Sequence, residues 1–376
     1  MQRIYLDHAA STIVEKSVLE LIIAHTANNF ANPSALHTEG RKAKAAIETA
    51  RKQIATCLNC NSNELFFCSS ATEANNTVIK SAVYSLGVQT IISSRLEHPC
   101  VENSILWVKK TFPNTQIAYV DSTESGQIDL SHLEKLLAAD DSKKLFSIIH
   151  AHNELGFINP IAEIGNLCER FGAYFHTDAV QTASRLELGL EKGRIHFAVA
   201  SGHKIGAGKG AAALFISRKI GLKSFIHGGS QERGFRAGTE NTTAIAAFGK
   251  AWELAHTEKN IRQEQLLSLK NIFIQEISQL IPNIQFNYSD QNNSLSHIVS
   301  LRLPTDLALS TLLFKLDLAG LSVSAGAACS AGAVVASSVS RFLNLPAGYQ
   351  TIRVSFSHHN TTEEVLKAAA IIAKIK

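Results

Sequence analysis

A lysine in the segment 197–210 lies where an apolar, strand-like run gives way to a glycine-rich turn. Ser201 and His203 come just before this lysine, Lys204. The pattern places a lysine at the mouth of a sheet, among groups that can hold a phosphate. A lysine held in this way can form a Schiff base with pyridoxal 5'-phosphate, PLP. The alternative interpretation is a surface lysine that follows a strand.

An aspartate earlier in the chain supports the same interpretation. Asp178 follows the strand-like run 173–177. A carboxylate there could keep the pyridine nitrogen of PLP protonated, so that the ring acts as an electron sink. Asp178 alone could equally be the cap of a helix. Together, Asp178 and Lys204 favour a PLP site.

The elements around these residues alternate between short apolar runs and helical stretches, which is typical of βαβ units and a mainly parallel sheet. The strand-like runs are 64–68, 90–93, 145–150, 173–177 and 197–200. A long helix is expected over 34–58, and 211–216 is expected to pair back antiparallel after the glycine turn. Beyond about residue 255 the pattern changes to a helix over 256–281, strands at 297–303 and 351–357, and a final capped helix. We therefore expect a large domain over 16–255 and a smaller α+β domain formed by 1–15 and 256–376.

Polar residues of catalytic type follow each of the five runs. In an open α/β sheet, ligands bind beyond the carboxyl ends of the strands. The residues that follow the first four runs are Ser70, Thr72 and Glu73, then His98, then His152, Asn153 and Glu154, then Asp178 and Gln181. Ser70 and Glu73 have the spacing of a capping box, and a helix start with a threonine hydroxyl can bind phosphate. One such residue would usually be a cap, but five strands that deliver them to one edge indicate a site.

Two residues near the end of the chain have open interpretations. Cys329 lies in a run of small residues, 324–333, where it is either an exposed nucleophile or one more small residue. Arg353 is expected on the polar face of the strand 351–357, opposite Ile352 and Val354. It is either a solvent-facing charge or a bidentate clamp for a substrate carboxylate.

Size and composition exclude several classes of protein. The 376 residues are 45% apolar and 18% charged, as expected for a globular protein of two domains. The net charge of +4 comes from scattered lysines and arginines, so nothing indicates a nucleic-acid partner. The first residues carry no signal or transit pattern, and no apolar run is long enough to span a membrane. We expect a cytoplasmic protein.

The six cysteines form no regular disulfide framework. Cys57 and Cys60 have the spacing of a redox or zinc pair, but no second pair or pair of histidines lies nearby. The pair falls where the helix is expected to end, and cysteine packs well as a small hydrophobic residue. A structural role is therefore the favoured interpretation.

Over nearly its whole length the sequence resembles the cysteine desulfurases of the class V aminotransferase group. The matching segments are 5–10, 32–37, 70–76, 97–98, 153–156, 178–181, 201–204, 228–234, 236–239, Cys329 and 352–356. This resemblance implies the PLP fold-type I, with a mainly parallel seven-stranded sheet in the large domain and an α+β C-terminal domain. It also implies a homodimer.

The resemblance implies a role for each matching residue around the cofactor. Lys204 would form the Schiff base, and His98 would stack on the ring and shuttle protons. Asp178 would pair with the pyridine nitrogen and Gln181 with the ring hydroxyl. The phosphate would be held by Thr72, Ser201, His203 and, from the second subunit, Thr239.

The remaining implied roles concern the substrate. Asn153, also beside the cofactor, and Arg353 would bind the carboxylate of L-cysteine. Cys329 would take the sulfur as a persulfide, leave L-alanine, and pass the sulfur to an acceptor for iron–sulfur cluster assembly or thiolation. No resident metal is implied, although Cys329 could be a transient iron–sulfur ligand.

Two other functions remain open from the sequence. One is a selenocysteine lyase or another class V PLP aminotransferase, against which Cys329 on a small-residue loop argues. The other is a non-catalytic adaptor that docks sulfur-transfer proteins. The presence of Lys204, Asp178 and His98 together argues against that reading.

Overall fold

The computed structural model describes residues 3–288, 293–325 and 338–376, which form two compact units. The larger unit comprises 13–150 and 159–257, and the smaller comprises 3–12, 151–158 and the described residues from 258 onward. The segment 151–158 belongs to the smaller unit, although it lies inside the range 16–255 assigned to the large domain from sequence. In the described ranges, no helix combines the length and the apolar character needed to cross a bilayer.

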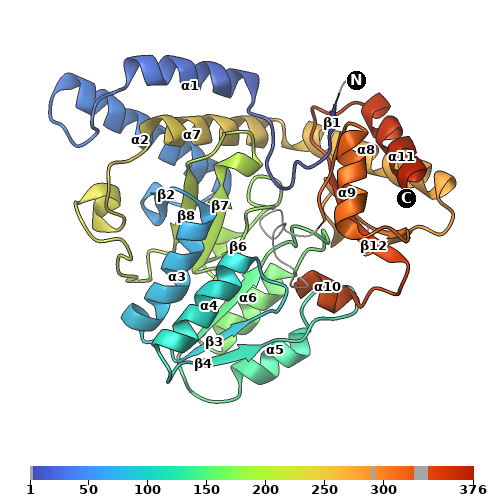
Figure 1. The fold of residues 1–376 in the computed structure, drawn as a ribbon. Helices are drawn as coiled ribbons and strands as arrows, with labels where there is room; N and C mark the ends of the chain where they lie inside the picture. Colours follow the sequence, from blue (N-terminus) through green and yellow to red (C-terminus); the bar gives the residue numbers. More distant parts are fainter. Residues whose placement is uncertain (1–2, 289–292, 326–337) are drawn as a thin grey trace. The chain divides into compact units, whose positions relative to one another are not determined.

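A seven-stranded sheet forms the centre of the larger unit (Figure 1). Its order is β2 (Leu65–Cys68), β8 (Ala212–Ile216), β7 (Phe197–Ser201), β6 (Tyr174–Asp178), β5 (Lys144–Ile149), β3 (Thr90–Ser93) and β4 (Gln116–Tyr119). Neighbouring strands pair in parallel except at β8, which is antiparallel to both β2 and β7. The antiparallel return after the glycine turn is confirmed. Strand β4 was not predicted, because none of its residues is fully buried and its sequence shows no apolar run.

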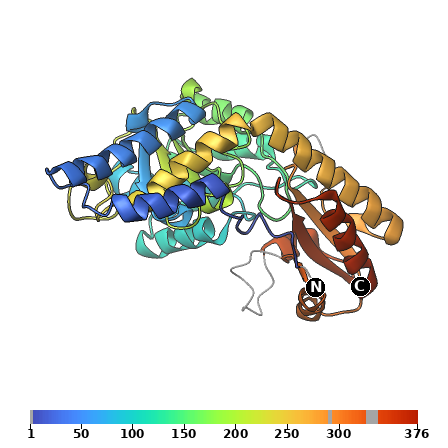
Figure 2. The same ribbon diagram turned by 90° about the horizontal axis from the view of Figure 1, so that it is seen from above.

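Both faces of this sheet are covered, as its sequence requires. Every residue of β5 is buried. Two consecutive residues of this strand, Leu145 and Phe146, belong to hydrophobic clusters on opposite faces of the sheet. Parallel strands buried on both faces read as continuous apolar runs. The helices of this unit are α1 (Lys16–Asn28), α2 (Thr38–Leu58), α3 (Ala71–Leu86), α4 (Pro99–Thr111), α5 (Leu130–Leu137), α6 (Ile161–Arg170) and α7 (Thr242–Thr257). Helix α7 packs against α1 and α2, whereas α3 packs against α4 (Figures 1 and 2).

The smaller unit is an α+β structure with its own apolar core. Its strands are β1 (Ile4–Tyr5), β9 (Gln285–Phe286), β10 (Ile298–Pro304), β11 (Leu321–Ser322) and β12 (Tyr349–Ser355). Its helices are α8 (Lys259–Leu280), α9 (Leu309–Leu318), α10 (Ser338–Leu343) and α11 (Thr362–Ile375). Strand β10 pairs antiparallel with β12 and β9, and β1 pairs in parallel with β11. Helix α11 is capped as expected, but its capping box is formed by Thr361 and Glu364, one residue later than the predicted pair Asn360 and Glu363.

Candidate active site

Parallel strands bring the first group of predicted residues to one edge of the sheet. Asp178 is the last residue of β6 and is paired with Ile149 on one side and Val199 on the other. Strand β7 ends at Ser201, and the 3-10 turn Gly202–Lys204 follows. Asp178, Ser201 and Lys204 therefore lie at the carboxyl ends of neighbouring strands, where ligands bind in open α/β sheets.

The carboxylate of Asp178 is buried and held by two donors. The side chain is 4% exposed. Its Oδ2 accepts a hydrogen bond from Asn75 Nδ2 at 2.8 Å, and its Oδ1 accepts one from the Val180 N–H at 3.0 Å. Asn75 lies on α3 and is itself completely buried, with no hydrogen-bond partner for its Oδ1 among the described residues. The carboxylate is thus fixed in orientation.

His98 is the N-cap of α4 and lies near both Asp178 and Lys204. Its Nδ1 accepts from the Cys100 N–H at 3.2 Å. Burial lowers the pKa of His98, the charge of Asp178 raises it, and the charge of Lys204 lowers it. These opposing influences show that the structure brings the predicted imidazole, carboxylate and amine together.

The residues predicted to hold phosphate lie around the start of α3 and the turn at Lys204. Ser70 caps α3 by accepting from the Glu73 N–H at 3.2 Å, and exposed Thr72 lies in the first turn. Ser201 is buried. His203 is partly buried, and its pKa is lowered to about 4 by burial and then by the charges of Lys204 and Lys209. First-turn N–H groups, hydroxyls and a ring nitrogen are suitable donors for an anion.

Two further predicted cofactor residues differ in their burial. Gln181 follows β6 and is 3% exposed. Thr239 is exposed at the end of a loop, 228–239, that is tied to its own chain by ion pairs. In that loop Arg236 donates to both oxygens of Glu73, at 2.7 and 3.0 Å.

The smaller unit holds the residues predicted to bind the substrate carboxylate, and it corrects one interpretation of Arg353. Arg353 is 3% exposed rather than solvent-facing. Its Nη2 forms an ion pair with Asp7 Oδ1 at 2.6 Å, and its Nη1 donates to the Asn153 carbonyl at 2.8 Å. The strand alternation was read correctly, but Asp7 and Asn153 come from distant segments and cover that face. Arg353 and Asn153 are therefore neighbours.

Cys329 lies outside the described residues. The five described cysteines are free thiols. Burial raises the pKa of Cys57 to about 11 and that of Cys60 to about 12. Both pack against the core of the larger unit, in line with a structural role.

Three residues beside the predicted site were missed from the sequence. No role was predicted for Asn75 or Cys100, yet Asn75 contacts Asp178 and Cys100 contacts His98. Glu97 is buried, accepts from the Ile149 N–H at 2.8 Å, and has its pKa raised well above the usual range by burial. Asn75 and Glu97 lie inside the matching segments 70–76 and 97–98, and Cys100 is two residues from His98, but the sequence alone gave none of them a role.

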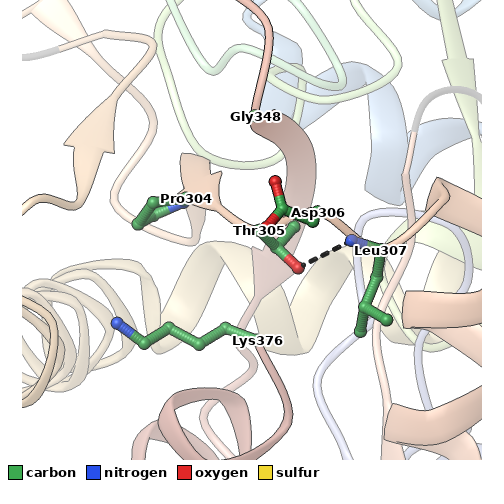
Figure 3. Close-up of a pocket in the computed structure, with 6 residues that line it drawn as sticks. All are labelled: Pro304, Thr305, Asp306, Leu307, Gly348 and Lys376. Carbon is green, nitrogen blue, oxygen red and sulfur yellow. Dashed lines mark hydrogen bonds between the residues drawn. The ribbon is translucent and has the colours of Figure 1, made fainter.

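A surface pocket of the smaller unit does not coincide with these residues. It is lined by Pro304, Thr305, Asp306, Leu307, Gly348 and Lys376 (Figure 3). Two of these residues contact each other, since Thr305 Oγ1 accepts a hydrogen bond from the Leu307 N–H at 3.2 Å (Figure 3). None of these six residues was predicted to bind a cofactor or a substrate.

Known proteins resemble this chain over its full length. Residues 4–367 match the family described as aminotransferase class-V. The cysteine desulfurase IscS of Dictyoglomus turgidum is 34% identical over 385 residues, covering 100% of this chain and 94% of that protein. A NifS-like protein from Rickettsia africae is 34% identical, with a TM-score of 0.87, and the match covers 99% of this chain and 98% of that one. SspA, solved in complex with cysteine, is 30% identical, with a TM-score of 0.81 and coverage of 95% and 100%. The chain therefore belongs to the class-V aminotransferase family and, within it, to the cysteine desulfurases.

Proposed function

We propose that this protein removes sulfur from L-cysteine with the help of PLP, releases L-alanine, and carries the sulfur as a persulfide on Cys329. The observation that supports this most is the convergence of Lys204, Asp178 and His98 at one sheet edge. The amine could form the Schiff base with PLP, the fixed carboxylate could pair with the pyridine nitrogen, and the imidazole could stack on the face of the ring. A relative of this chain has been solved in complex with cysteine, which supports the substrate.

The residues present suit PLP in their chemistry. Lys204 would anchor it covalently, Asp178 would pair with its ring nitrogen, and Gln181 with its ring hydroxyl. Thr72, Ser201 and His203 would hold its phosphate, where the start of α3 adds N–H donors. When bound, PLP supplies an electron sink for charge that develops at the substrate α-carbon.

In this proposal the chain's own groups carry the proton and sulfur transfers. Lys204 Nζ removes the α-proton of L-cysteine, and Arg353 with Asn153 holds the substrate carboxylate. The Cys329 thiolate attacks the substrate sulfur, so that a sulfur–sulfur bond forms as the Cβ–S bond breaks. The carbon fragment keeps the electron pair, takes up protons and leaves as L-alanine. The persulfide sulfur then passes to an acceptor protein, such as an iron–sulfur scaffold or a thiolation carrier.

We also propose a homodimer in which Thr239 of one subunit contacts the phosphate bound by the other. Support comes from the exposure of Thr239 at the end of a loop that is anchored to its own chain. Analytical ultracentrifugation of the PLP-loaded protein should give a dimer. An active, PLP-loaded monomer would contradict the proposal.

The role of Lys204 can be tested by its cofactor. The variant Lys204→Ala should lose the visible absorbance of covalently bound PLP together with turnover. Lys209→Ala, which removes an exposed lysine of the same turn, is the matched control and should keep both. Retention of the absorbance by Lys204→Ala would show that another lysine is the anchor.

The role of Cys329 can be tested by locating the sulfur. After one turnover with L-cysteine, alkylation and mass spectrometry should find the extra sulfur on Cys329. The variant Cys329→Ser should keep PLP and bind L-cysteine without forming a persulfide, because a hydroxyl is not a soft nucleophile. Sulfur on Cys57, Cys60 or Cys100 would overturn the assignment. Full activity of the serine variant would instead indicate a lyase mechanism.

A further inference from the structure

The sulfur of Cys100 lies between two polar side chains of the larger unit. Cys100 Sγ is 3.0 Å from Nδ1 of His98 and 3.3 Å from Nδ2 of Asn75. The same Nδ2 is 2.8 Å from Oδ2 of Asp178. Asn75 and Cys100 therefore form a bridge, here called the Asn75–Cys100 bridge, between the buried carboxylate and the imidazole.

The donors in this bridge determine where the protons lie. The backbone N–H of Cys100 can only donate, so His98 Nδ1 must accept with its lone pair. A neutral His98 then carries its proton on Nε2. Burial raises the pKa of the Cys100 thiol to about 12, although hydrogen bonds from Asn75 and Thr72 oppose the shift. The neutral thiol can thus share the Nδ1 lone pair with the N–H in a bifurcated hydrogen bond, while its sulfur accepts from Asn75.

We propose that Cys100 is a positioning residue that, together with Asn75, holds His98 in the neutral Nε2–H form and links it to Asp178. The significance of this for catalysis rests on the proposed function, in which His98 lies against PLP. With Nδ1 occupied, His98 presents a hydrogen-bond donor, not a lone pair, at Nε2. The orientation of the ring is then set by Cys100 through both its N–H and its thiol.

Other titratable groups near His98 also affect its pKa, and the effect of Cys100 adds to theirs. Asp178 on β6 raises the pKa of His98, whereas Lys204 after β7 lowers it. Glu97 precedes His98 in the chain and is buried, and burial raises its pKa well above the usual range. A hydrogen bond to the unprotonated Nδ1 stabilises the neutral ring and therefore lowers the pKa of His98 further.

The test is a histidine ¹⁵N NMR titration of the full-length protein, with PLP bound and after PLP removal. The His98 signals are identified by their absence from His98→Asn. The wild type should show an unprotonated Nδ1 in the neutral form. In Cys100→Ala, which is smaller than cysteine, and in Cys100→Val, which is larger, the His98 midpoint should rise by about 0.5–1 pH unit, the effect of one neutral hydrogen bond. Cys100→Ser, which keeps a donor, should restore the wild-type midpoint, and Cys57→Ala is the matched control.

Three results would overturn the proposal. They are a proton on Nδ1 in the wild type, an unchanged midpoint in both donor-free variants, and a raised midpoint that the serine variant does not restore. Because the titration of the PLP-free protein does not depend on turnover, it separates this proposal from the proposed function. Loss of the desulfurase activity with an intact His98 titration would contradict only the latter.

Discussion

At the scale of single residues, Arg353 shows how distant segments change the meaning of a local pattern. Its strand alternates as predicted, and alternation alone places the guanidinium on a polar face. Asp7 and Asn153 then cover that face, and no local rule could predict contacts across this sequence separation. By contrast, Lys204, Asp178 and His98 could be predicted together, because the ends of parallel strands meet at one edge.

The contacts of Arg353 allow a specific prediction for the variant Arg353→Ala. Under the proposed function, Arg353→Ala should raise KM for L-cysteine about ten- to a hundredfold while PLP stays bound, the usual loss for a charge-assisted bidentate contact. Steady-state kinetics and the visible absorbance measure the two effects.

Asp7→Asn is the matched control for this variant. It removes the charge from the same ion pair but keeps the guanidinium available to a substrate. Its KM should change much less. An equal rise of KM in both variants would mean that Arg353 acts by holding Asp7, not by binding substrate.

At the scale of elements, the loop 228–239 is held in a conformation that its residues do not favour. Glu232 and Arg233 both adopt positive φ angles, 45° and 58°, which are costly for residues other than glycine. The buried Glu232 carboxylate contacts both Nη atoms of Arg51, at 2.7 and 2.8 Å, and accepts from the Phe67 N–H at 2.7 Å. These contacts tie the loop to α2 and to the edge strand β2. The sequence showed the motif but could not predict its partner on a distant helix.

Breaking this anchor should destabilise the larger unit. Glu232→Ala leaves Arg51, which is 1% exposed, without its buried partner, and this should cost about 3–5 kcal/mol. Glu48→Ala removes a second partner of the same arginine, but the Glu48 side chain is 41% exposed, so about 1 kcal/mol or less is expected. Urea unfolding of both variants gives the comparison. Equal losses of unfolding free energy in the two variants would show that the buried Arg51–Glu232 pair contributes no more to stability than the exposed pair with Glu48.

At the scale of the whole molecule, the core of the larger unit contains histidines that burial keeps neutral. His150 and His176 are 3% and 0% exposed, and burial lowers the pKa of each to about 3. The rest of the fold followed from broad patterns, because alternating apolar runs and helices predicted the parallel sheet. The polar interior could not be predicted, since a histidine inside an apolar strand gives no sign of its depth.

These histidines predict acid sensitivity. In the unfolded chain their pKa is near 6.5, so the unfolded state binds more protons between about pH 6.5 and pH 3. Stability is therefore complete above about pH 6.5 and is lost as the pH falls, by about 1.4 kcal/mol per pH unit for each histidine. His176→Gln should flatten the fall in unfolding free energy between pH 6.5 and 5. His256→Gln, at an exposed position, is the matched control. If both variants showed the same slope of unfolding free energy against pH, the buried histidines would not be the cause of the acid sensitivity.

The proposed function is tested most directly by the products formed from L-cysteine. Purified protein loaded with PLP should release L-alanine in an amount equal to the sulfur recovered as persulfide and, with a reductant present, as sulfide. Amino-acid analysis and sulfide determination on the same reaction measure both. Equal yields of alanine and sulfur are the predicted result. Formation of pyruvate and ammonia, or transamination without sulfur release, would contradict the account.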